Sequence, residues 1–184
     1  MPEVDLPIAR DTRSLIPPTL QRTVRRSLSR GPEAGTPAKP LFGVLPIKRF
    51  VPQDIHSLLD YANGLAVMGV ALGADEPACT AGLALGWSVV GVSLLTDYRL
   101  SVRKIIPIEV HEAIDYAWGL AAIASPFIFG YARRSPLSAI VHIAVGVSTI
   151  IGSLFTDYRA QVGVKWGKGR LAQALPPAGA TVGA

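Results

Sequence analysis

The sequence PIEVHEAIDY, from Pro107 to Tyr116, repeats a stretch found fifty-five positions earlier, PQDIHSLLDY from Pro52 to Tyr61. Both stretches begin with Pro, place an acidic residue two positions later, and continue with an aliphatic residue, a His and Asp-Tyr-Ala. Each then runs through Gly-Leu-Ala into apolar sequence. Internal repetition at a fixed period identifies the unit of folding. We therefore interpret the chain as a tandem repeat.

The two copies also end alike, with SLLTDYR at residues 93–99 and SLFTDYR at residues 153–159. These closing stretches are sixty positions apart, so the second copy contains five additional residues between its two ends. The predicted organisation is a basic, Pro-rich tail (1–47), repeat 1 (48–104), repeat 2 (105–160) and a basic C-terminal tail (161–184).

The composition is typical of a membrane protein. Of the 184 residues, 49% are hydrophobic and only 17% are charged, and the mean hydropathy is +0.36. Apolar residues concentrate between positions 55 and 155, whereas charged residues lie at the ends and in short gaps. The first forty residues contain no apolar core of a secretory signal peptide, and the single Cys79 excludes an intrachain disulfide.

Four segments have nearly the length needed to cross a bilayer, about twenty residues. They lie at about 55–73, 78–96, 110–131 and 137–156, and two of the gaps between them are short turns. The predicted fold class is all-α: a polytopic membrane protein with four transmembrane helices, arranged as two helical-hairpin repeats of the same orientation.

The basic residues predict how these helices are oriented. Sixteen of the eighteen Lys and Arg residues lie before the first segment, in the link between the hairpins or after the fourth segment, and only Arg133 and Arg134 lie at a hairpin tip. The positive-inside tendency then places both termini in the cytoplasm, with the protein in a bacterial inner membrane. We expect the N-terminal tail to be flexible or to dock on a partner, and residues 15–28 could form a short basic helix on anionic lipid.

Because each repeat contains two crossings, its polar residues are expected at the cytoplasmic boundary, in two matching clusters. We expect the acidic residues to pair with Arg99, Arg159, Arg103 or Lys104 and with Tyr hydroxyls, fastening one hairpin to the other. The clusters comprise His56, Asp60, Tyr61, Asp97, Tyr98, Arg99, His111, Asp115, Tyr116, Asp157, Tyr158 and Arg159.

Three functional interpretations of these residues compete with a structural role in holding the two hairpins together. A haem could be ligated by His56 and His111, which have equal predicted depth on equivalent helices. A chlorin pigment could be ligated by His142, the one His deep within an apolar segment. The four repeated aspartates could instead form a proton or ion pathway, although coupling sites of transporters usually lie near the bilayer midplane.

Ser125-Pro126-Phe127 lies inside the third segment, where Pro removes a backbone hydrogen bond and should kink the helix. With the His-x-x-Leu/Ile-Asp-Tyr-Ala openings, the Phe-Gly-Tyr that follows Pro126 and the Thr-Asp-Tyr closings, it makes the chain resemble the SPW-repeat family of small bacterial integral membrane proteins. The likeness covers Pro52 to Arg159. Phe127 replaces the family's Trp, and Val70-Ala71-Leu72 of the first copy lacks the motif. The resemblance implies a four-helix membrane module and no established activity.

The expected function is a non-catalytic accessory or scaffolding subunit of a larger bacterial membrane complex, respiratory or photosynthetic, that packs through its helices and N-terminal tail. The alternatives are a haem- or chlorin-binding electron- or energy-transfer protein and a small proton or ion transporter. The sequence contains no nucleophile–base pair, phosphate-binding Gly loop or metal-ligand motif. We therefore expect no enzyme activity, no metal centre and no nucleic-acid partner; the lipid bilayer is the expected surrounding.

Overall fold

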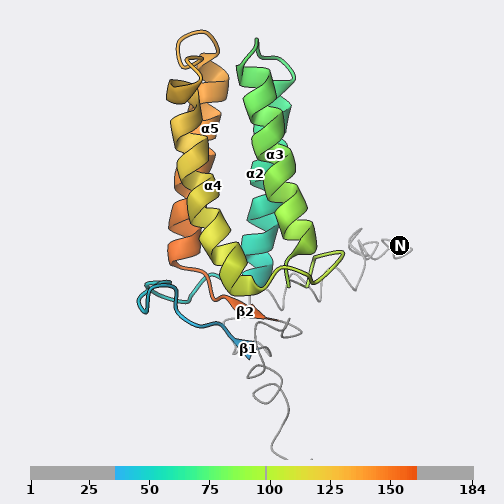
Figure 1. Cartoon of the computed structure of the whole chain (residues 1–184), viewed down its shortest axis with the longest axis vertical. Helices are drawn as coiled ribbons and strands as arrows, with labels where there is room; N and C mark the ends of the chain where they lie inside the picture. The colour runs from blue at the N-terminus through green and yellow to red at the C-terminus, as the bar shows by residue number, and fades with distance from the viewer. Residues whose placement is uncertain (1–35, 98, 161–184) are drawn as a thin grey trace, which may run out of the picture.

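The computed structural model describes residues 36–97 and 99–160 and is all-helical, with four helices and one pairing of two very short strands (Figure 1). Residues 1–35, Tyr98 and the C-terminal tail lie outside the described part, and so does the predicted lipid-binding helix at 15–28. The helices are α2 (Gln53–Ala71), α3 (Ala78–Leu95), α4 (Ile108–Ile128) and α5 (Pro136–Leu154).

Prolines define where the helices begin. Pro52 and Pro107 stand directly before α2 and α4, and Pro136 is the first residue of α5. A Pro at these positions loses nothing, because the first N–H groups of a helix have no partner within the helix. Asp54 and Glu109 follow in the first turns of α2 and α4, where a negative charge favours the helix dipole.

The helices form two hairpins that point in the same direction. α2 packs on α3 and α4 packs on α5, and both connecting turns lie at the same end of the bundle (Figure 1). Between the hairpins, α2 and α5 are in more extensive contact than α3 and α4. Pro126 lies inside α4, which nevertheless continues to Ile128.

At the opposite end, two equivalent backbone pairings connect the hairpins. Segment 102–106 pairs with the end of α3, and segment 47–51 pairs in the same way with the end of α5. β1 (Thr36–Pro37) and β2 (Arg159–Ala160) add an antiparallel pairing beside the second of these. The matched N–H to O distances are Val102–Leu94 2.9 Å, Ile106–Leu95 2.8 Å, Ile47–Leu154 2.9 Å and Val51–Phe155 2.9 Å. The segment that leads into α4 is thus bonded to the end of hairpin α2–α3, and the segment that leads into α2 is bonded to the end of hairpin α4–α5.

Within each hairpin, the helices approach most closely where two glycines face each other. A Cβ built on Gly146 would lie 2.6 Å from the Gly119 carbonyl oxygen, and one built on Gly86 would lie 2.7 Å from the Gly64 carbonyl oxygen. Small residues that allow backbones to approach are a principal source of helix packing energy in lipid.

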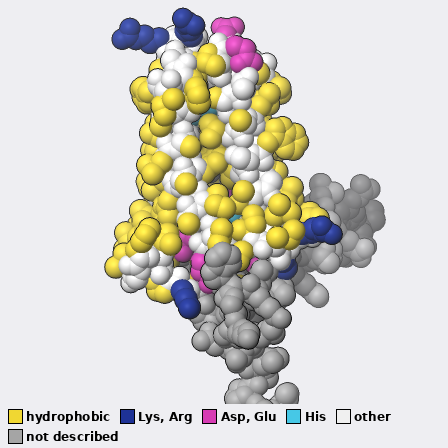
Figure 2. Space-filling view, viewed as in Figure 1, with side chains coloured by type: hydrophobic (Ala, Val, Ile, Leu, Met, Phe, Trp, Pro, Cys, Tyr) yellow, Lys and Arg dark blue, Asp and Glu magenta, His cyan; other side chains and the backbone are white. Residues whose placement is uncertain are grey.

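Two of the helices, α3 and α5, are long and apolar enough to cross a membrane on their own. α2 and α4 have a similar length but carry acidic and His residues in their first turns. Figure 2 shows charged side chains at both ends of the bundle and mainly apolar and neutral side chains on the face between them.

The glycine contact predicts opposite effects for two Gly-to-Ala substitutions. Gly146→Ala places a methyl group against the backbone of α4 and should lower the free energy of unfolding by about 1–3 kcal/mol. Gly91→Ala, in α3, has nothing within 4 Å of the new methyl group, so the better helix propensity of Ala should stabilise the protein slightly. Thermal unfolding of both variants in detergent measures the difference; equal effects would contradict the close approach.

Candidate functional site

His56, Asp60, His111 and Asp115 meet at the beginnings of α2 and α4, and we call them the His–Asp quartet. All four side chains are at most 2% exposed. The shortest contact crosses between the helices, with His56 Nε2 2.9 Å from Asp115 Oδ2, and a second crossing contact joins His111 Nε2 to Asp60 Oδ2 at 3.2 Å. The contacts within each helix measure 3.5 Å in α2 and 3.1 Å in α4. Each carboxylate therefore contacts both imidazoles.

The repeat explains why these four residues converge. His and Asp are four positions apart in both copies and so lie on one face of their helix. α2 and α4 begin at the same end of the bundle (Figure 1), so the two pairs have the same depth. The side chains of both pairs are buried, and the two imidazole centroids are 5.9 Å apart at an interplanar angle of 80°.

A threonine fixes the protonation of Nδ1 on each histidine. Thr156 Oγ1 lies 2.9 Å from His56 Nδ1 and donates its own proton to the Gly152 carbonyl at 2.7 Å. The hydroxyl must then accept a hydrogen bond from Nδ1–H. Thr96 holds His111 in the same way, at 2.9 Å, and donates to the Val92 carbonyl at 2.7 Å. Both Nε2 atoms consequently face the carboxylates.

Hydroxyl groups also surround the two carboxylates. Ser93 donates to Asp60 at 3.1 Å, and Ser153 donates to Asp115 at 3.3 Å. The Tyr158 hydroxyl adds a bond of 2.8 Å to Asp115. Burial, together with the neighbouring Asp115 carboxylate, holds the pKa of Tyr158 well above its ordinary value. The hydroxyl therefore remains protonated and continues to donate.

The other predicted polar residues lie around this centre and not within it. The basic residues pair with Asp54, Asp97 and Asp157. Asp60 and Asp115 are instead contacted by histidines and hydroxyl groups. The Tyr116 hydroxyl is buried without a hydrogen-bond partner among the described residues. The surrounding polar residues make four other contacts: Arg99–Asp54 at 2.7 Å, Lys104–Asp97 at 3.4 Å, Arg159–Asp157 at 3.0 Å and Tyr61 Oη to the Leu100 carbonyl at 3.1 Å.

Sequence reasoning did not assign a role to the serines and threonines that contact the quartet. Ser93, Thr96, Ser153 and Thr156 belong to the repeated closing stretches, and their recurrence was the available signal. Glu112 gave no such signal, because the equivalent position in the first copy is Ser57. Its side chain is fully buried beside His111, and neither oxygen has a hydrogen-bond partner in the part of the chain that the structure describes.

A second polar cluster, formed by Ser125, Tyr131 and His142, lies toward the hairpin tips. Tyr131 Oη is 2.6 Å from Ser125 Oγ and 2.7 Å from His142 Nδ1. Ser125 donates to the Ala122 carbonyl at 3.0 Å. The Tyr131 hydroxyl must then donate to Ser125 and accept from His142 Nδ1–H. The Ser of the Ser-Pro-Phe motif thus ends a chain of hydrogen bonds that orients His142.

Neither histidine arrangement leaves space for a large macrocycle. A haem between His56 and His111 would have to displace both aspartates, which contact Nε2 of each ring at 2.9–3.5 Å. His142 Nε2 is buried without a hydrogen-bond partner among residues 36–97 and 99–160, and it lies against α3, 3.1 Å from where a Cβ on Gly82 would stand. A chlorin at His142 would therefore have to push α3 aside. The quartet can hold opposite charges together or bind a small cation.

Comparison of the chain with protein-family models, with curated proteins and with solved structures finds no match. The likeness to the SPW-repeat family thus rests on the motifs quoted above and stays an expectation.

The quartet predicts a strong dependence of stability on Asp115. Asp115→Asn removes the charge that both imidazoles face, and breaking a buried ion pair on one side typically costs about 3–5 kcal/mol. Asp157→Asn changes a more exposed acid paired with Arg159 and should cost less than about 1 kcal/mol. Chemical unfolding in detergent measures both, and similar small losses would contradict the fastening role of the quartet.

The second cluster predicts that Tyr131→Phe leaves His142 Nδ1–H without its acceptor in a buried position. The expected loss in free energy of unfolding is about 1–3 kcal/mol. Tyr61→Phe is the matched control, because the Tyr61 hydroxyl bonds a carbonyl at the surface, where water replaces it. Thermal unfolding that ranks the two variants equally would rule out the proposed chain of hydrogen bonds.

Proposed function

We propose that the chain crosses a bacterial inner membrane four times, as two hairpin repeats of the same orientation with cytoplasmic termini. We further propose that it is a non-catalytic accessory subunit of a larger membrane complex. The proposal is supported by an outer surface that suits contact with lipid or other helices, and by the pairing of Asp60 and Asp115 with His56 and His111 inside the bundle.

Large apolar side chains protrude from every helix. Leu65, Trp87, Leu120 and Ile140, one from each helix, are all more than 60% exposed. Exposed apolar surface on this scale marks a membrane or protein contact. The acids near the start of α2 and α4 are withdrawn from that surface, because Asp60 and Asp115 are buried in the quartet. Pairing lowers the cost of placing α2 and α4 in the bilayer beside the more apolar α3 and α5.

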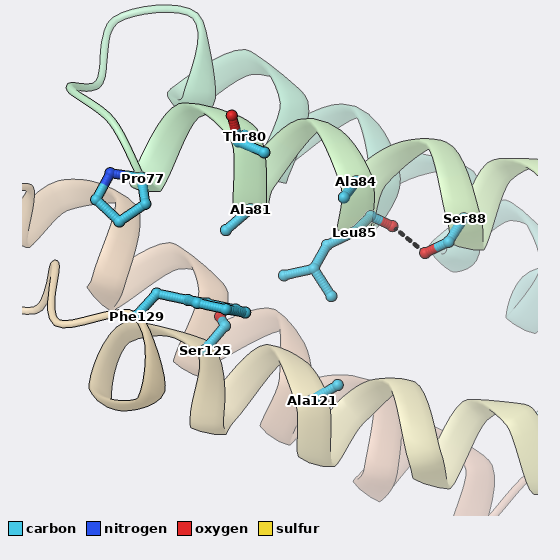
Figure 3. Close-up of a pocket in the computed structure, with 9 residues that line it drawn as sticks. All are labelled: Pro77, Thr80, Ala81, Ala84, Leu85, Ser88, Ala121, Ser125 and Phe129. Atoms are coloured by element: carbon cyan, nitrogen blue, oxygen red, sulfur yellow. Dashed lines mark hydrogen bonds between the residues drawn. The ribbon is translucent and has the colours of Figure 1, made fainter.

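A groove between α3 and α4 is the observation that best supports a partner subunit (Figure 3). It has a volume of about 360 Å³ and opens to the outside where the two hairpins separate. The small side chains of Ala81, Ala84 and Ala121 line the groove without filling it, and Leu85 and Phe129 supply apolar contacts. Small side chains let another helix approach closely, so we assign the groove to a transmembrane helix of the partner. The full lining is Pro77, Thr80, Ala81, Ala84, Leu85, Ser88, Ala121, Ser125 and Phe129.

The alternative functions have weaker geometric support. A haem- or chlorin-binding role would require displacing either the two aspartates or α3. A proton or ion pathway through the four repeated aspartates would require them to be spread across the bundle, whereas Asp60 and Asp115 lie in the quartet at one end and Asp97 and Asp157 lie beyond the ends of α3 and α5. We therefore retain the accessory role.

The groove predicts which substitutions should release the chain from its complex. Ala84→Trp and Ala121→Trp fill the groove and should abolish copurification of partner subunits after gentle detergent extraction. Native gels of tagged protein expressed in its own host, followed by mass spectrometry of the bands, provide the measurement.

Ala66→Trp is the matched control, since Ala66 is exposed on α2 outside the groove. It should leave the complex intact. A wild-type chain that always migrates alone would refute the accessory role, and a complex that survives both groove substitutions would refute the groove as its contact.

A further inference from the structure

We propose that the His–Asp quartet binds one divalent cation of the zinc class, ligated by His56, Asp60, His111 and Asp115. The proposal concerns a metal site and does not depend on the accessory role. It rests on the arrangement of the four donor atoms, on the orientation of both imidazoles and on the charge balance of the site.

The donor atoms lie close enough together to share one small ion. One ligand atom from each residue can be chosen so that all four lie within 4.8 Å of one another. Bonds of about 2.0–2.1 Å from zinc to nitrogen or oxygen place tetrahedral ligands about 3.3 Å apart. The four Nε2–carboxylate distances are 2.9, 3.1, 3.2 and 3.5 Å, and each imidazole contacts a different oxygen of each carboxylate. Binding one ion would therefore require each carboxylate to turn one oxygen toward both imidazoles.

Both imidazoles present the correct nitrogen to this position. Thr156 and Thr96 accept hydrogen bonds from the Nδ1–H groups, so Nε2 of each ring is left to face the centre. Metal-ligating histidines usually donate their other N–H to an oxygen, which fixes the tautomer and the ring orientation. The serine and tyrosine hydroxyls that bond the carboxylates hold the acidic ligands in the same manner.

Charge balance permits one divalent cation in place of two protons. Two carboxylates and two neutral imidazoles carry a charge of −2, which one divalent cation neutralises. Without the ion, the contacts of Nε2 with carboxylate oxygens require a proton on each Nε2, and two imidazolium rings then lie 5.9 Å apart in a buried site. Binding exchanges these two Nε2 protons for one cation, with the protons released to solvent, so the net charge of the site does not change.

The ligand set indicates the class of metal. Imidazole nitrogen suits zinc and similar transition ions, whereas Mg²⁺ and Ca²⁺ prefer six or more oxygen ligands. Glu112 provides another buried carboxylate beside the quartet, within electrostatic range of His56 and His111.

The test uses the full-length chain in detergent, purified without a polyhistidine tag and in a Cys79→Ser background that excludes thiol binding. Protein from zinc-supplemented cultures, and protein stripped and reloaded with Zn²⁺, should each contain one zinc per chain by elemental analysis. Co²⁺ should give the intense visible bands of a tetrahedral site. An excess of Mg²⁺ should not displace either ion.

Variants identify the ligands. His56→Gln with His111→Gln should abolish binding, and His142→Gln, a matched change of a buried His outside the quartet, should retain it. Thr96→Val with Thr156→Val keeps all four ligands and should weaken affinity about 10- to 100-fold. A wild-type stoichiometry near zero in both preparations, a weak octahedral Co²⁺ spectrum, or binding that survives in the His56/His111 variant would each overturn the proposal.

Discussion

Two imidazoles and two carboxylates close into one buried ring where α2 and α4 begin, and the assembly of the bundle depends on this contact. Charged groups removed from water are costly unless each has a partner of opposite charge. The partners here come from the other hairpin: His56 is held by Asp115 and Thr156, and His111 is held by Asp60 and Thr96. Each hairpin therefore buries its His and Asp with partners that the other hairpin supplies.

The backbone follows the same exchange between hairpins. Segment 47–51 donates backbone hydrogen bonds to the end of α5, as segment 102–106 does to the end of α3. The two hairpins are therefore joined by main-chain hydrogen bonds as well as by the side chains of the quartet. The five additional residues of the second copy fall between Gly119 and Gly146, on the side of the hairpin tip. A longer tip therefore leaves the glycine contact and the quartet undisturbed, which explains why an insertion is tolerated there.

Much of this could be predicted from the repeated stretches, and the remainder could not for physical reasons. The spacing of His and Asp places them on one helix face, and the apolar composition predicts a helical fold with helices suited to a membrane. Spacing alone does not reveal that each His also contacts the Asp of the other helix, because that depends on how closely α2 and α4 approach. The expected partners of the acids were basic residues and Tyr hydroxyls. Tyr158 does bond Asp115, but Arg99 and Arg159 contact Asp54 and Asp157, and histidines contact Asp60 and Asp115 instead. Segment 47–51 resembles 102–106 only in its apolar-basic-basic-apolar-apolar pattern, which is too short to stand out.

The three histidines have the same hydrogen bonding at Nδ1 but different surroundings at Nε2, and the surroundings of Nε2 decide their chemistry. In each, Nδ1–H is held by a hydroxyl that leads to a helix carbonyl, of Gly152, Val92 or Ala122. What Nε2 then meets is different. At His142 it faces the backbone of α3 near Gly82, where there is no charge and no space, so this residue serves packing. At His56 and His111 it faces two carboxylates, so the same local geometry produces a site that must hold either two protons or one cation.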